Sequence, residues 1–363
     1  MNLTTSWLKS TSILKRSAFS AKNSLRIPHA IRNRASLLST SSILRADKTN
    51  QSVEEWAAQA KSSSSSFNEI IDGRRLAHLR NTLAPHMPQA YPQLKLDAKT
   101  KEAASGEELF PNSHLVYFWL LNPENELSRD GYFSGEAPPA PYLQRVWAGG
   151  ELEFNTSNPL CVGQDASLTM KIDSVTEKQR SPEAGGPIIL VSMSRTAENN
   201  NGFSLKETRN LAYMEKTNPS RKIIKSSRLT VSNSHFNHTF TPTEILLFRY
   251  SALTWNSHRI HYDFNYSNKI EKHPNNLVHG PLTCTMLLEL LRTNSPNGYK
   301  LRNFKYRAVS PLYSNQPLTL CGTWSKDSGT SEKTGENELV CELFALNNEG
   351  GVAMSGKATL TKV

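Results

Sequence analysis

The chain has 363 residues, of which 37% are hydrophobic and 20% are charged, so it can build a packed core and is not an intrinsically disordered protein. That length leaves room for two domains of about 100–150 residues each. The formal net charge of +10 is typical of nucleic-acid-binding proteins, but eight basic residues and no acidic ones lie within residues 1–46. Removing these eight leaves about +2 on the rest of the chain, which argues against a nucleic-acid partner.

Residues 1–46 have the composition of a mitochondrial transit peptide. They are rich in Arg, Lys and Ser and carry scattered apolar side chains, a pattern that responds to an inside-negative membrane potential. A secretory signal would need an uninterrupted apolar core of about 7–15 residues, and none is present. A disordered basic tail is the alternative. The sequence therefore predicts a mitochondrial matrix protein whose leader is removed near residues 35–50.

The cysteines and the apolar runs exclude two further classes of protein. No apolar stretch approaches the roughly 18–20 residues that span a bilayer, so we expect no membrane insertion. The four cysteines, Cys161, Cys284, Cys321 and Cys341, lie far apart and form no CxxC pair. We expect reduced, mostly packed thiols and neither a disulfide framework nor a zinc knot.

Residues 47–113 are predicted as an N-terminal helical and linker segment. The five-serine run at residues 62–66 is typical of a solvated linker or of the entry to a helix. Apolar side chains within residues 68–83 have helical spacing. Residues 93–113 are polar and acidic, and we expect them to form a loop.

Residues 114–220 are predicted as the first of two β-rich units. Residues 115–121 form a short apolar and aromatic run that predicts a buried strand. Further along, apolar and polar residues alternate, as at Leu168 and Met170, which predicts strands with one buried face. The Gly- and Pro-rich residues 180–187 predict a turn between two of these strands.

Residues 221–363 are predicted as a second unit because the chain resembles itself at an offset of 152 residues. Four identities and one aromatic pair fall within fifteen positions, where about one identity is expected by chance. The matched pairs are Phe154 with Tyr306, Pro159 with Pro311, Leu160 with Leu312, Gln164 with Gln316, and Leu168 with Leu320. The unit ends on an alternating strand over residues 353–363.

One segment of the second unit is clearly helical. Leu282, Met286, Leu287, Leu290 and Leu291 recur at helical spacing. Such a helix is apolar around much of its circumference, so another element must wrap it. A helix embraced by a curved antiparallel sheet, with the arrangement present twice, is the simplest architecture for this pattern.

The densest group of polar and aromatic side chains occupies residues 248–263, and residues 279–282 follow at the start of the predicted helix. This arrangement resembles the signature of the MaoC-like enoyl-thioester hydratases, in which an acid precedes a His by five residues and a His-Gly element opens the central helix. Residues 146–150 and 304–312 also resemble the two-hot-dog branch of that family, which contains fungal mitochondrial hydroxyacyl-thioester dehydratases and bacterial mesaconyl-thioester hydratases. The likeness runs from about residue 110 to the end of the chain.

The resemblance implies an α+β double hot-dog fold, in which two curved antiparallel sheets each wrap a central helix. It also implies a hydro-lyase that adds or removes water across the α–β bond of an acyl thioester of coenzyme A or acyl carrier protein. The physiological direction would be the dehydration of (3R)-hydroxyacyl carrier protein in mitochondrial fatty-acid synthesis. No cofactor is expected, and the chain lacks the GxSxG, Walker and GxGxxG motifs.

The residue types in this cluster suit the removal of water from a 3-hydroxyacyl thioester. The reaction needs a base for the α-hydrogen, an acid for the hydroxyl, and donors for the thioester oxygen. We assign His261 as the base, since imidazole titrates near neutrality. The N–H of Gly280 at the helix N-terminus is the expected oxyanion donor, because Gly permits close approach. Asn256 is expected to orient the water or the hydroxyl.

Asn256 departs from the family pattern, since many MaoC-like enzymes have Asp at this position. An amide cannot usefully exchange a proton at neutral pH. Either His261 handles both proton transfers, or a neighbour such as Asp263 or His258 supplies the second group.

Further polar residues near the cluster are candidates for substrate binding. They are His258, Arg259, Tyr262, His279, Arg249 and Arg307. Arg249 and Arg307 belong with Lys300, Arg302 and Lys305 to a basic set that would meet an anionic phosphopantetheine arm or an acidic carrier protein. A solvated strand edge explains the same set equally well.

Structural roles compete with these functional ones. His258 is suited to a structural position at the rim of the site, Arg259 to a salt bridge, and His279 to a hydrogen bond with the backbone. A metal site at His258 and His261 lacks a third ligand at a diagnostic spacing, so we expect none.

The first unit has no matching His/Asp cluster, and we expect that it has lost catalysis and lines a tunnel for the acyl chain. Two other functions stay open. One is a hydratase for a short dicarboxylic thioester such as mesaconyl or itaconyl coenzyme A, and the other is a non-catalytic acyl-binding subunit. A duplicated unit completes its hot-dog pair within one chain, so a monomer and a homodimer are both compatible with the sequence.

Overall fold

The structure is a computed structural model of the chain. It describes residues 51–92, 102–133, 135, 137–182, 185–215, 223–325, 329–330 and 337–363. The predicted transit peptide, residues 1–46, lies outside the described residues, as do residues 93–101 of the predicted loop.

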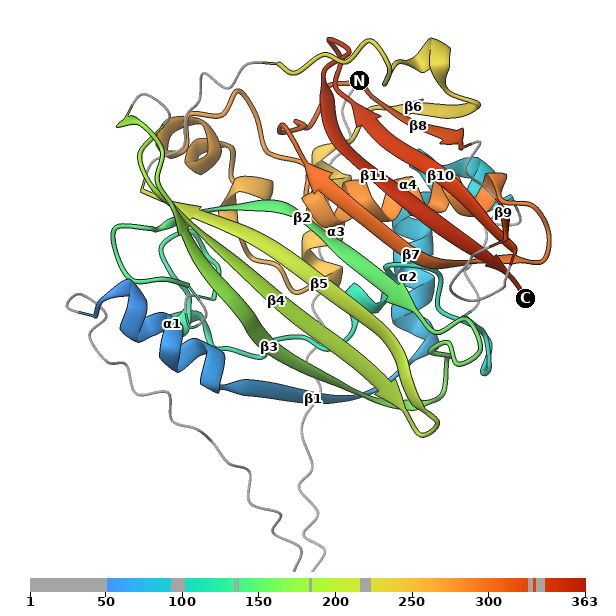
Figure 1. Ribbon diagram of the computed structural model, residues 1–363, viewed down its shortest axis with the longest axis horizontal. Helices are drawn as coiled ribbons and strands as arrows, with labels where there is room; N and C mark the ends of the chain where they lie inside the picture. Colours follow the sequence, from blue (N-terminus) through green and yellow to red (C-terminus); the bar gives the residue numbers. More distant parts are fainter. Residues whose placement is uncertain are drawn as a thin grey trace, which may run out of the picture. The chain divides into compact units, whose positions relative to one another are not determined.

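One antiparallel sheet runs through both halves of the chain (Figure 1). Its strand order is β1-β3-β4-β5-β2-β7-β11-β10-β8-β6, and β9 pairs with β10 beside this path. The strands are β1 (Ser64–Ile70), β2 (Gln144–Phe154), β3 (Asp165–Lys178), β4 (Ile188–Asn199), β5 (Gly202–Met214), β6 (Phe236–Phe240), β7 (Tyr299–Ala308), β8 (Leu318–Trp324), β9 (Gly329–Thr330), β10 (Asn337–Leu346) and β11 (Val352–Lys362).

The strand order shows the duplication that the sequence predicted. With β9 set aside, each half contributes five strands, and both halves have the same order: first, third, fourth, fifth and second. The two halves meet where β2 pairs with β7, and in this register Leu152 faces Phe304. These two residues are equivalent at the offset of 152 residues, so the pseudo-twofold axis that relates the two halves passes between them.

The predicted linker at residues 62–66 is wrong in part, because Ser64–Ile70 form strand β1. This strand pairs with β3 from Ser64 opposite Lys171 onward. Residues of β1 are extended because their backbone groups hydrogen-bond to β3; the serine side chains do not determine this conformation. Since β1 is part of the first five-stranded half, we propose that this half begins near Ser64 and not at residue 114.

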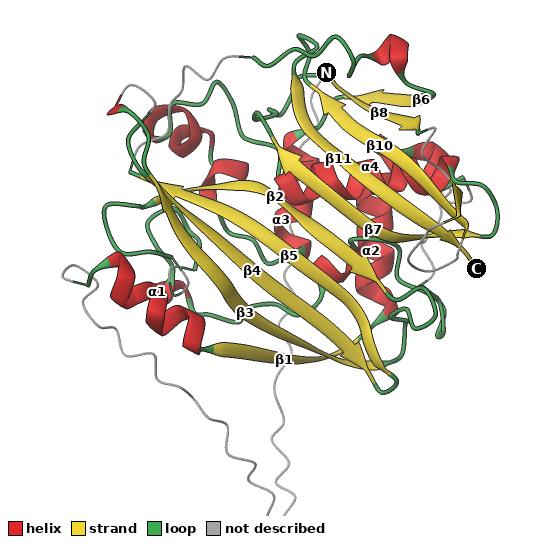
Figure 2. Cartoon of the chain, in the orientation of Figure 1, coloured by secondary structure: helices red, strands yellow, loops and turns green. Residues whose placement is uncertain are grey.

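Four α-helices accompany the sheet, and Figure 2 shows α2, α3 and α4 gathered behind its second half. They are α1 (Val53–Ser62), α2 (Gly73–Leu83), α3 (Glu244–Leu253) and α4 (Gly280–Asn294). The predicted helix is confirmed as α4, which lies against β6, β8 and β10. All its residues from Leu282 to Leu291 are buried.

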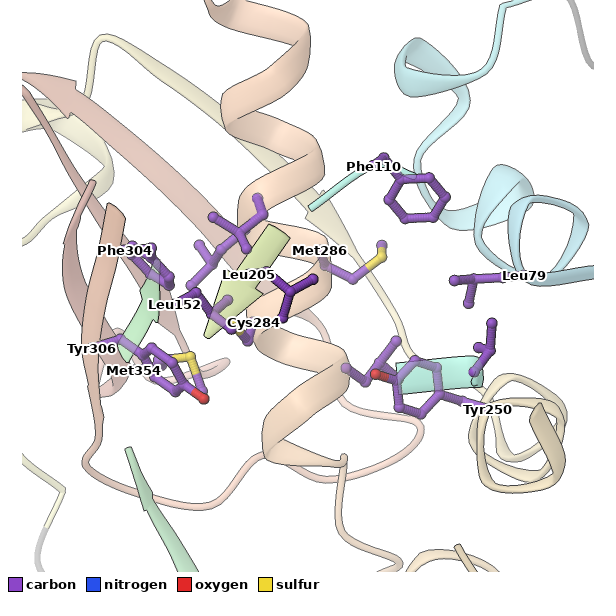
Figure 3. Close-up of a cluster of buried hydrophobic side chains, with 14 of the residues drawn as sticks. Leu79, Phe110, Leu152, Leu205, Tyr250, Cys284, Met286, Phe304, Tyr306 and Met354 are labelled. Carbon is purple, nitrogen blue, oxygen red and sulfur yellow. The ribbon is translucent and has the colours of Figure 1, made fainter. Parts of the chain in front are cut away.

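Side chains from both halves surround α4 (Figure 3). Phe304, Tyr306 and Met354 approach it from the sheet, while Leu79 and Phe110 lie on the other side, towards which Met286 points. The helix is therefore the centre of a single apolar core.

The first half has no counterpart of α4 among its described residues. The described residues between α2 and β2 form short 3-10 turns, of which Ser113–Val116 is one, and isolated bridges, but no α-helix. The strand predicted at residues 115–121 is wrong. Asn112 and Phe118 adopt positive φ angles of 71° and 55°, which interrupt an extended backbone. Residues 115–118 of the run are buried, as their composition indicated, but they form irregular chain and no helix.

Burial of α4 predicts a large difference between two leucine substitutions. Leu287 is completely buried, whereas Leu121 is 78% exposed. We expect Leu287→Ala to lower the free energy of unfolding by about 2–5 kcal/mol and Leu121→Ala to change it by less than about 0.5 kcal/mol. Urea denaturation of both variants measures this, and equal effects would contradict the assigned core.

Candidate active site

A cavity of about 280 Å³ lies at the N-terminal end of α4 and is lined by both halves of the chain. The second half contributes Asn256, His258, His261 and Gly280. The first half contributes residues of β2, β3, β4 and β5 and the loop before β2. The structure thus brings together the predicted base, the predicted oxyanion donor and the predicted orienting amide.

The backbone between α3 and α4 sets the direction of the His261 ring. Helix α3 begins at Thr243, whose hydroxyl accepts the Leu246 N–H, and the chain reverses after it at Trp255, which has a φ of 51°. His261 then closes a 3-10 turn. Its Nδ1 lies 2.9 Å from the carbonyl oxygen of Leu277, so Nδ1 carries the hydrogen and donates it. Nε2 is left as the basic nitrogen, and it has no hydrogen-bond partner among the described residues.

A second imidazole supports the ring of His261. The rings of His261 and His279 stack with centroids 3.6 Å apart. His279 precedes the first residue of α4, is fully buried, and its Nε2 lies 2.8 Å from the Ser251 hydroxyl. The predicted substrate-binding residue His279 is therefore packed behind His261.

Burial keeps these imidazoles neutral. It lowers the pKa of His261 to about 4, with a further lowering by the Arg145 guanidinium and an opposing effect of the Leu277 carbonyl. Burial also holds the pKa values of His258 and His279 well below their ordinary range. At neutral pH His261 therefore has a free lone pair at Nε2 and is able to accept a proton.

Gly280 is the first residue of α4, where backbone N–H groups have no partner within the helix. No other group in the described part of the chain accepts its N–H. A Cβ atom at this position would lie 3.1 Å from Cγ of Trp147, a side chain of the first half. The close approach of the indole requires Gly here, and the free N–H beside the cavity is suited to stabilise an oxyanion.

Asn256 lines the same cavity as His261 and Gly280. Its Oδ1 accepts the backbone N–H of His258 at 3.1 Å, which fixes the orientation of the amide. The Nδ2 amino group is then the part of Asn256 that remains to donate to a hydroxyl or a water.

Besides Tyr262 and His279, four predicted site residues do not line this cavity. Asp263 binds the Arg259 guanidinium at 2.7 Å, which lowers the pKa of its carboxyl group, and neither residue lines the cavity. Arg249 and Arg307 are exposed and also line no part of it. The structure thus does not bring Asp263 to the expected position of a second acid or base.

An adjoining cavity of about 820 Å³ contains other predicted residues, Arg259 and Tyr262. Both cavities are bordered by Asn256 and Trp147. The second cavity therefore extends the site towards the surface, where Tyr262 is 46% exposed.

The predicted basic set is largely paired with acidic side chains. Lys300 contacts Glu108 at 2.6 Å, Lys305 lies 3.4 Å from Glu151, and Arg302 binds Glu338. These pairs reduce the positive charge available to a carrier protein along β7.

The first half supplies a buried ionic cluster that sequence reasoning missed. Glu207 accepts hydrogen bonds from Arg209 Nε at 2.6 Å and Arg195 Nη1 at 3.1 Å, and His114 Nε2 lies 3.2 Å away. Burial acts to raise the pKa of Glu207, but Arg209, His114 and Arg195 together hold it well below its ordinary value. Arg195 and Arg209 both line the cavity.

The alternation of residues along β4 and β5 could have indicated this cluster from the sequence. On β5, Glu207 and Arg209 have the same parity as the buried Leu205 and Leu211. On β4, Arg195 likewise follows the buried residue Met193 at a spacing of two. Charged side chains at inward positions of a strand indicate a functional or paired site.

The described residues contain no group of three or more His, Cys, Asp or Glu side chains arranged to hold a metal ion. Within the same part of the chain, every helix is too short or too polar to cross a bilayer.

Two curated relatives resemble the chain over most of its length. The mitochondrial hydroxyacyl-thioester dehydratase type 2 of Schizosaccharomyces pombe is 31% identical over 278 residues, which cover 70% of this chain and 88% of the relative. Mesaconyl-C(4)-CoA hydratase of Chloroflexus aurantiacus is 32% identical over 232 residues, covering 61% and 79%.

Solved structures confirm the fold class. A MaoC-like dehydratase of Phytophthora capsici matches 84% of this chain and 99% of its own, at 14% identity and a TM-score of 0.55. A Mycobacterium tuberculosis protein described as having a double hot-dog fold matches 85% and 98%, at 11% identity and a TM-score of 0.51.

A family model described as hydroxyacyl-thioester dehydratase type 2 matches residues 112–314, which include Asn256, His261 and Gly280. The match covers more than half of the chain and agrees with the resemblance seen in the sequence. This chain therefore belongs to the family of type 2 hydroxyacyl-thioester dehydratases.

Proposed function

We propose that the chain is a hydro-lyase that removes water from 3-hydroxyacyl thioesters and, in reverse, hydrates 2-enoyl thioesters. The observation that carries this proposal is the neutral His261 beside the start of α4. Its Nδ1 is held by the Leu277 carbonyl, and its Nε2 faces a cavity that the free Gly280 N–H also lines. Family membership supports the same reaction class.

In the direction of dehydration, His261 Nε2 takes the α-proton of the substrate. Negative charge develops on the thioester oxygen, where the Gly280 N–H stabilises it; loss of such a donor typically costs about 10²–10³ in rate. Asn256 Nδ2 holds the departing hydroxyl. His261 is buried, so its interactions act in a medium less polar than water and are stronger there.

The first half is suited to bind the acyl chain, because Met170, Met193 and Leu211 of its sheet line the cavity. We propose a binding role for this half and catalysis by the second. One chain contains both halves of the site, so a monomer is complete, and a further homodimer stays compatible with the fold.

We propose that the protein acts in the mitochondrial matrix on substrates of acyl carrier protein, with coenzyme A thioesters as alternatives. The composition of residues 1–46 supports mitochondrial import. The Schizosaccharomyces pombe relative is itself named as a mitochondrial protein. Mitochondrial fatty-acid synthesis is the process that such a location and reaction favour.

A hydratase of short dicarboxylic thioesters is the second candidate, and one observation favours it. Arg195 and Arg209 line the cavity, and the single carboxylate of Glu207 balances only one of them. The remaining positive charge is suited to a carboxylate on the acyl group. The Chloroflexus aurantiacus relative is named for a substrate of this kind.

Hydration of crotonyl coenzyme A tests the proposed reaction. We expect the purified chain to remove the absorbance of the conjugated thioester, and His261→Ala to lower kcat by about 10²–10⁴ through loss of the base. His78→Ala, at an exposed position of α2, is the matched control and should keep the wild-type rate. A wild-type protein that is inert towards crotonyl and longer enoyl thioesters would overturn the proposal.

The low pKa of His261 predicts an unusual pH profile. Because the folded-state pKa is lowered to about 4, the neutral base persists as the pH decreases from 7.5 to 5.5. We therefore expect kcat/KM for (3R)-hydroxybutyryl coenzyme A dehydration not to fall over this range. A base with the ordinary pKa of about 6.5 would lose about tenfold, and such a loss with intact near-UV circular dichroism would contradict the assignment.

Substrate preference separates the two candidates. With Arg195 and Arg209 serving mainly to hold Glu207, we expect kcat/KM for crotonyl coenzyme A to exceed that for mesaconyl coenzyme A by at least about tenfold, since an unneeded carboxylate must be desolvated in the cavity. Spectrophotometric assays of both thioesters measure the ratio. The opposite preference would support a dicarboxylic thioester as the substrate instead.

A further inference from the structure

Asp130 of the first half reaches into the cavity beside His258. It lies in the loop before β2 and lines the same cavity as His258 and His261. Its Oδ2 is 3.3 Å from Nε2 of His258. Sequence reasoning did not single out this carboxylate, because 128 positions separate it from its partner.

The loop that carries Asp130 is fixed to the catalytic segment by backbone contacts. The Asp130 carbonyl accepts the Arg259 N–H at 2.8 Å. At Gly131, whose φ is 82°, a Cβ atom would lie only 2.3 Å from the Ser257 carbonyl oxygen. The two segments therefore approach as closely as a glycine allows, and the position of Asp130 relative to His258 is well defined.

The carboxylate itself is oriented. Its Oδ1 accepts the Tyr132 N–H at 3.0 Å and also the Ser128 hydroxyl. These bonds leave Oδ2 for the His258 ring. The Asp130 side chain is only 16% exposed and that of His258 only 7%, so the contact is shielded from bulk water.

This contact defines the state of the His258 ring. A carboxylate at 3.3 Å from Nε2 favours the tautomer with its hydrogen on Nε2. Nδ1 then carries the lone pair, and none of the described residues forms a hydrogen bond with it. The ring lies with its centroid 5.5 Å from that of His261, so two imidazoles reach one cavity from neighbouring positions.

The site otherwise lacks a second group that exchanges protons. Asn256 is an amide, and Asp263 is bound to Arg259 outside the cavity. Glu271 is the other carboxyl group on the cavity wall, and burial raises its pKa. It accepts the Tyr266 hydroxyl at 2.9 Å and, among the described residues, forms no hydrogen bond or ion pair with either imidazole, so it is the weaker candidate.

We propose that Asp130 and His258 form the proton-transfer pair on the oxygen side of the reaction, while His261 serves the carbon side. His258 is the catalytic residue, and Asp130 is a positioning residue contributed by the half without a catalytic motif. This inference rests on the proposed dehydratase function and names the second acid/base group for it.

The proton balance of the reaction follows from this assignment. During dehydration His261 Nε2 accepts the α-proton, and the C–H electron pair forms the enolate and then the C=C bond as the Cβ–O bond breaks. For dehydration His258 starts as the imidazolium with its Nε2–H towards Asp130, and it gives its Nδ1 proton to the departing oxygen, which leaves as water. The ring then has the neutral form with its hydrogen on Nε2. Hydration reverses each transfer, and exchange with solvent restores both rings after a turnover.

The contact with Asp130 favours the protonated form of the buried His258 ring, which this role requires. Burial, with a contribution from Arg145, holds the pKa of His258 well below its ordinary value. Donation to the leaving oxygen needs the charged ring, which burial disfavours. The Asp130 carboxylate, 3.3 Å from Nε2, is placed to attract the positive charge of the imidazolium.

Two reactions measured on the same variants test the pair. Hydration of crotonyl coenzyme A requires both sides of the reaction, whereas deuterium exchange at the α-carbon of butyryl coenzyme A in D₂O requires only the carbon side. We expect Asp130→Asn and His258→Gln to lower kcat for hydration by about 10²–10³ with KM within about threefold. Both should keep α-exchange within about threefold of wild type, and His261→Ala should lose both reactions.

Asp130→Asn is a near-isosteric change, and its amide oxygen can still accept the Tyr132 N–H. Retained α-exchange shows in the same sample that the variant is folded and that its site is intact. Asp173→Asn, an exposed position on β3, is the matched control for the chemical change and should have wild-type rates in both reactions.

Three outcomes overturn the pair. Asp130→Asn with a wild-type hydration rate removes Asp130 from the reaction, and equal loss of hydration and α-exchange makes the pair structural. Loss of hydration alone in Glu271→Gln, with Asp130→Asn unaffected, assigns the role to Glu271. A wild-type chain inactive in hydration instead defeats the proposed function itself, so the two failures are distinguishable.

Discussion

The pairing of β2 with β7 is the contact on which the rest of the site depends. Without this pairing each half would end in an exposed strand edge, whose unpaired backbone groups promote aggregation. Joining the edges satisfies their backbone groups and buries Leu152 against Phe304 at the pseudo-twofold centre. The same register places Trp147 of β2 over Gly280, so the sheet of one half forms a wall beside the catalytic helix of the other. The cavity forms because β2 and β7 join the sheets of the two halves into one.

Two different solutions keep polar groups in this apolar setting. The His261 and His279 rings remain uncharged because burial disfavours the imidazolium, and one nitrogen of each ring bonds to the Leu277 carbonyl or the Ser251 hydroxyl. The first half instead retains full charges and compensates them, since Glu207 receives bonds from Arg195 and Arg209. A proton acceptor therefore lies close to fixed charges without being paired with them, which is how a buried site keeps one group reactive.

Local patterns in the sequence predicted what local forces determine. The spacing from Leu282 to Leu291 identified α4, and alternation identified most strands. The motif around His261 predicted a polar cluster, and Asn256, His261 and Gly280 do line one cavity. Contacts between distant segments were not predictable in this way. Strand β1 forms from a serine run because β3 supplies its hydrogen bonds, and residues 115–121 are apolar without being a strand because positive φ angles bend them. Asp130 was missed for the same reason, as only the folded loop brings it to His258.

Fusion of the two halves also changes how the site responds to concentration. In a hot-dog dimer built from separate chains, the two cavity walls belong to different molecules, and dilution dissociates them. Here the strand β7 and its partner β2 are parts of one polypeptide, so closure of the cavity is a unimolecular event that mass action does not weaken. An enzyme of this kind present at low copy number would keep a complete site in every folded molecule.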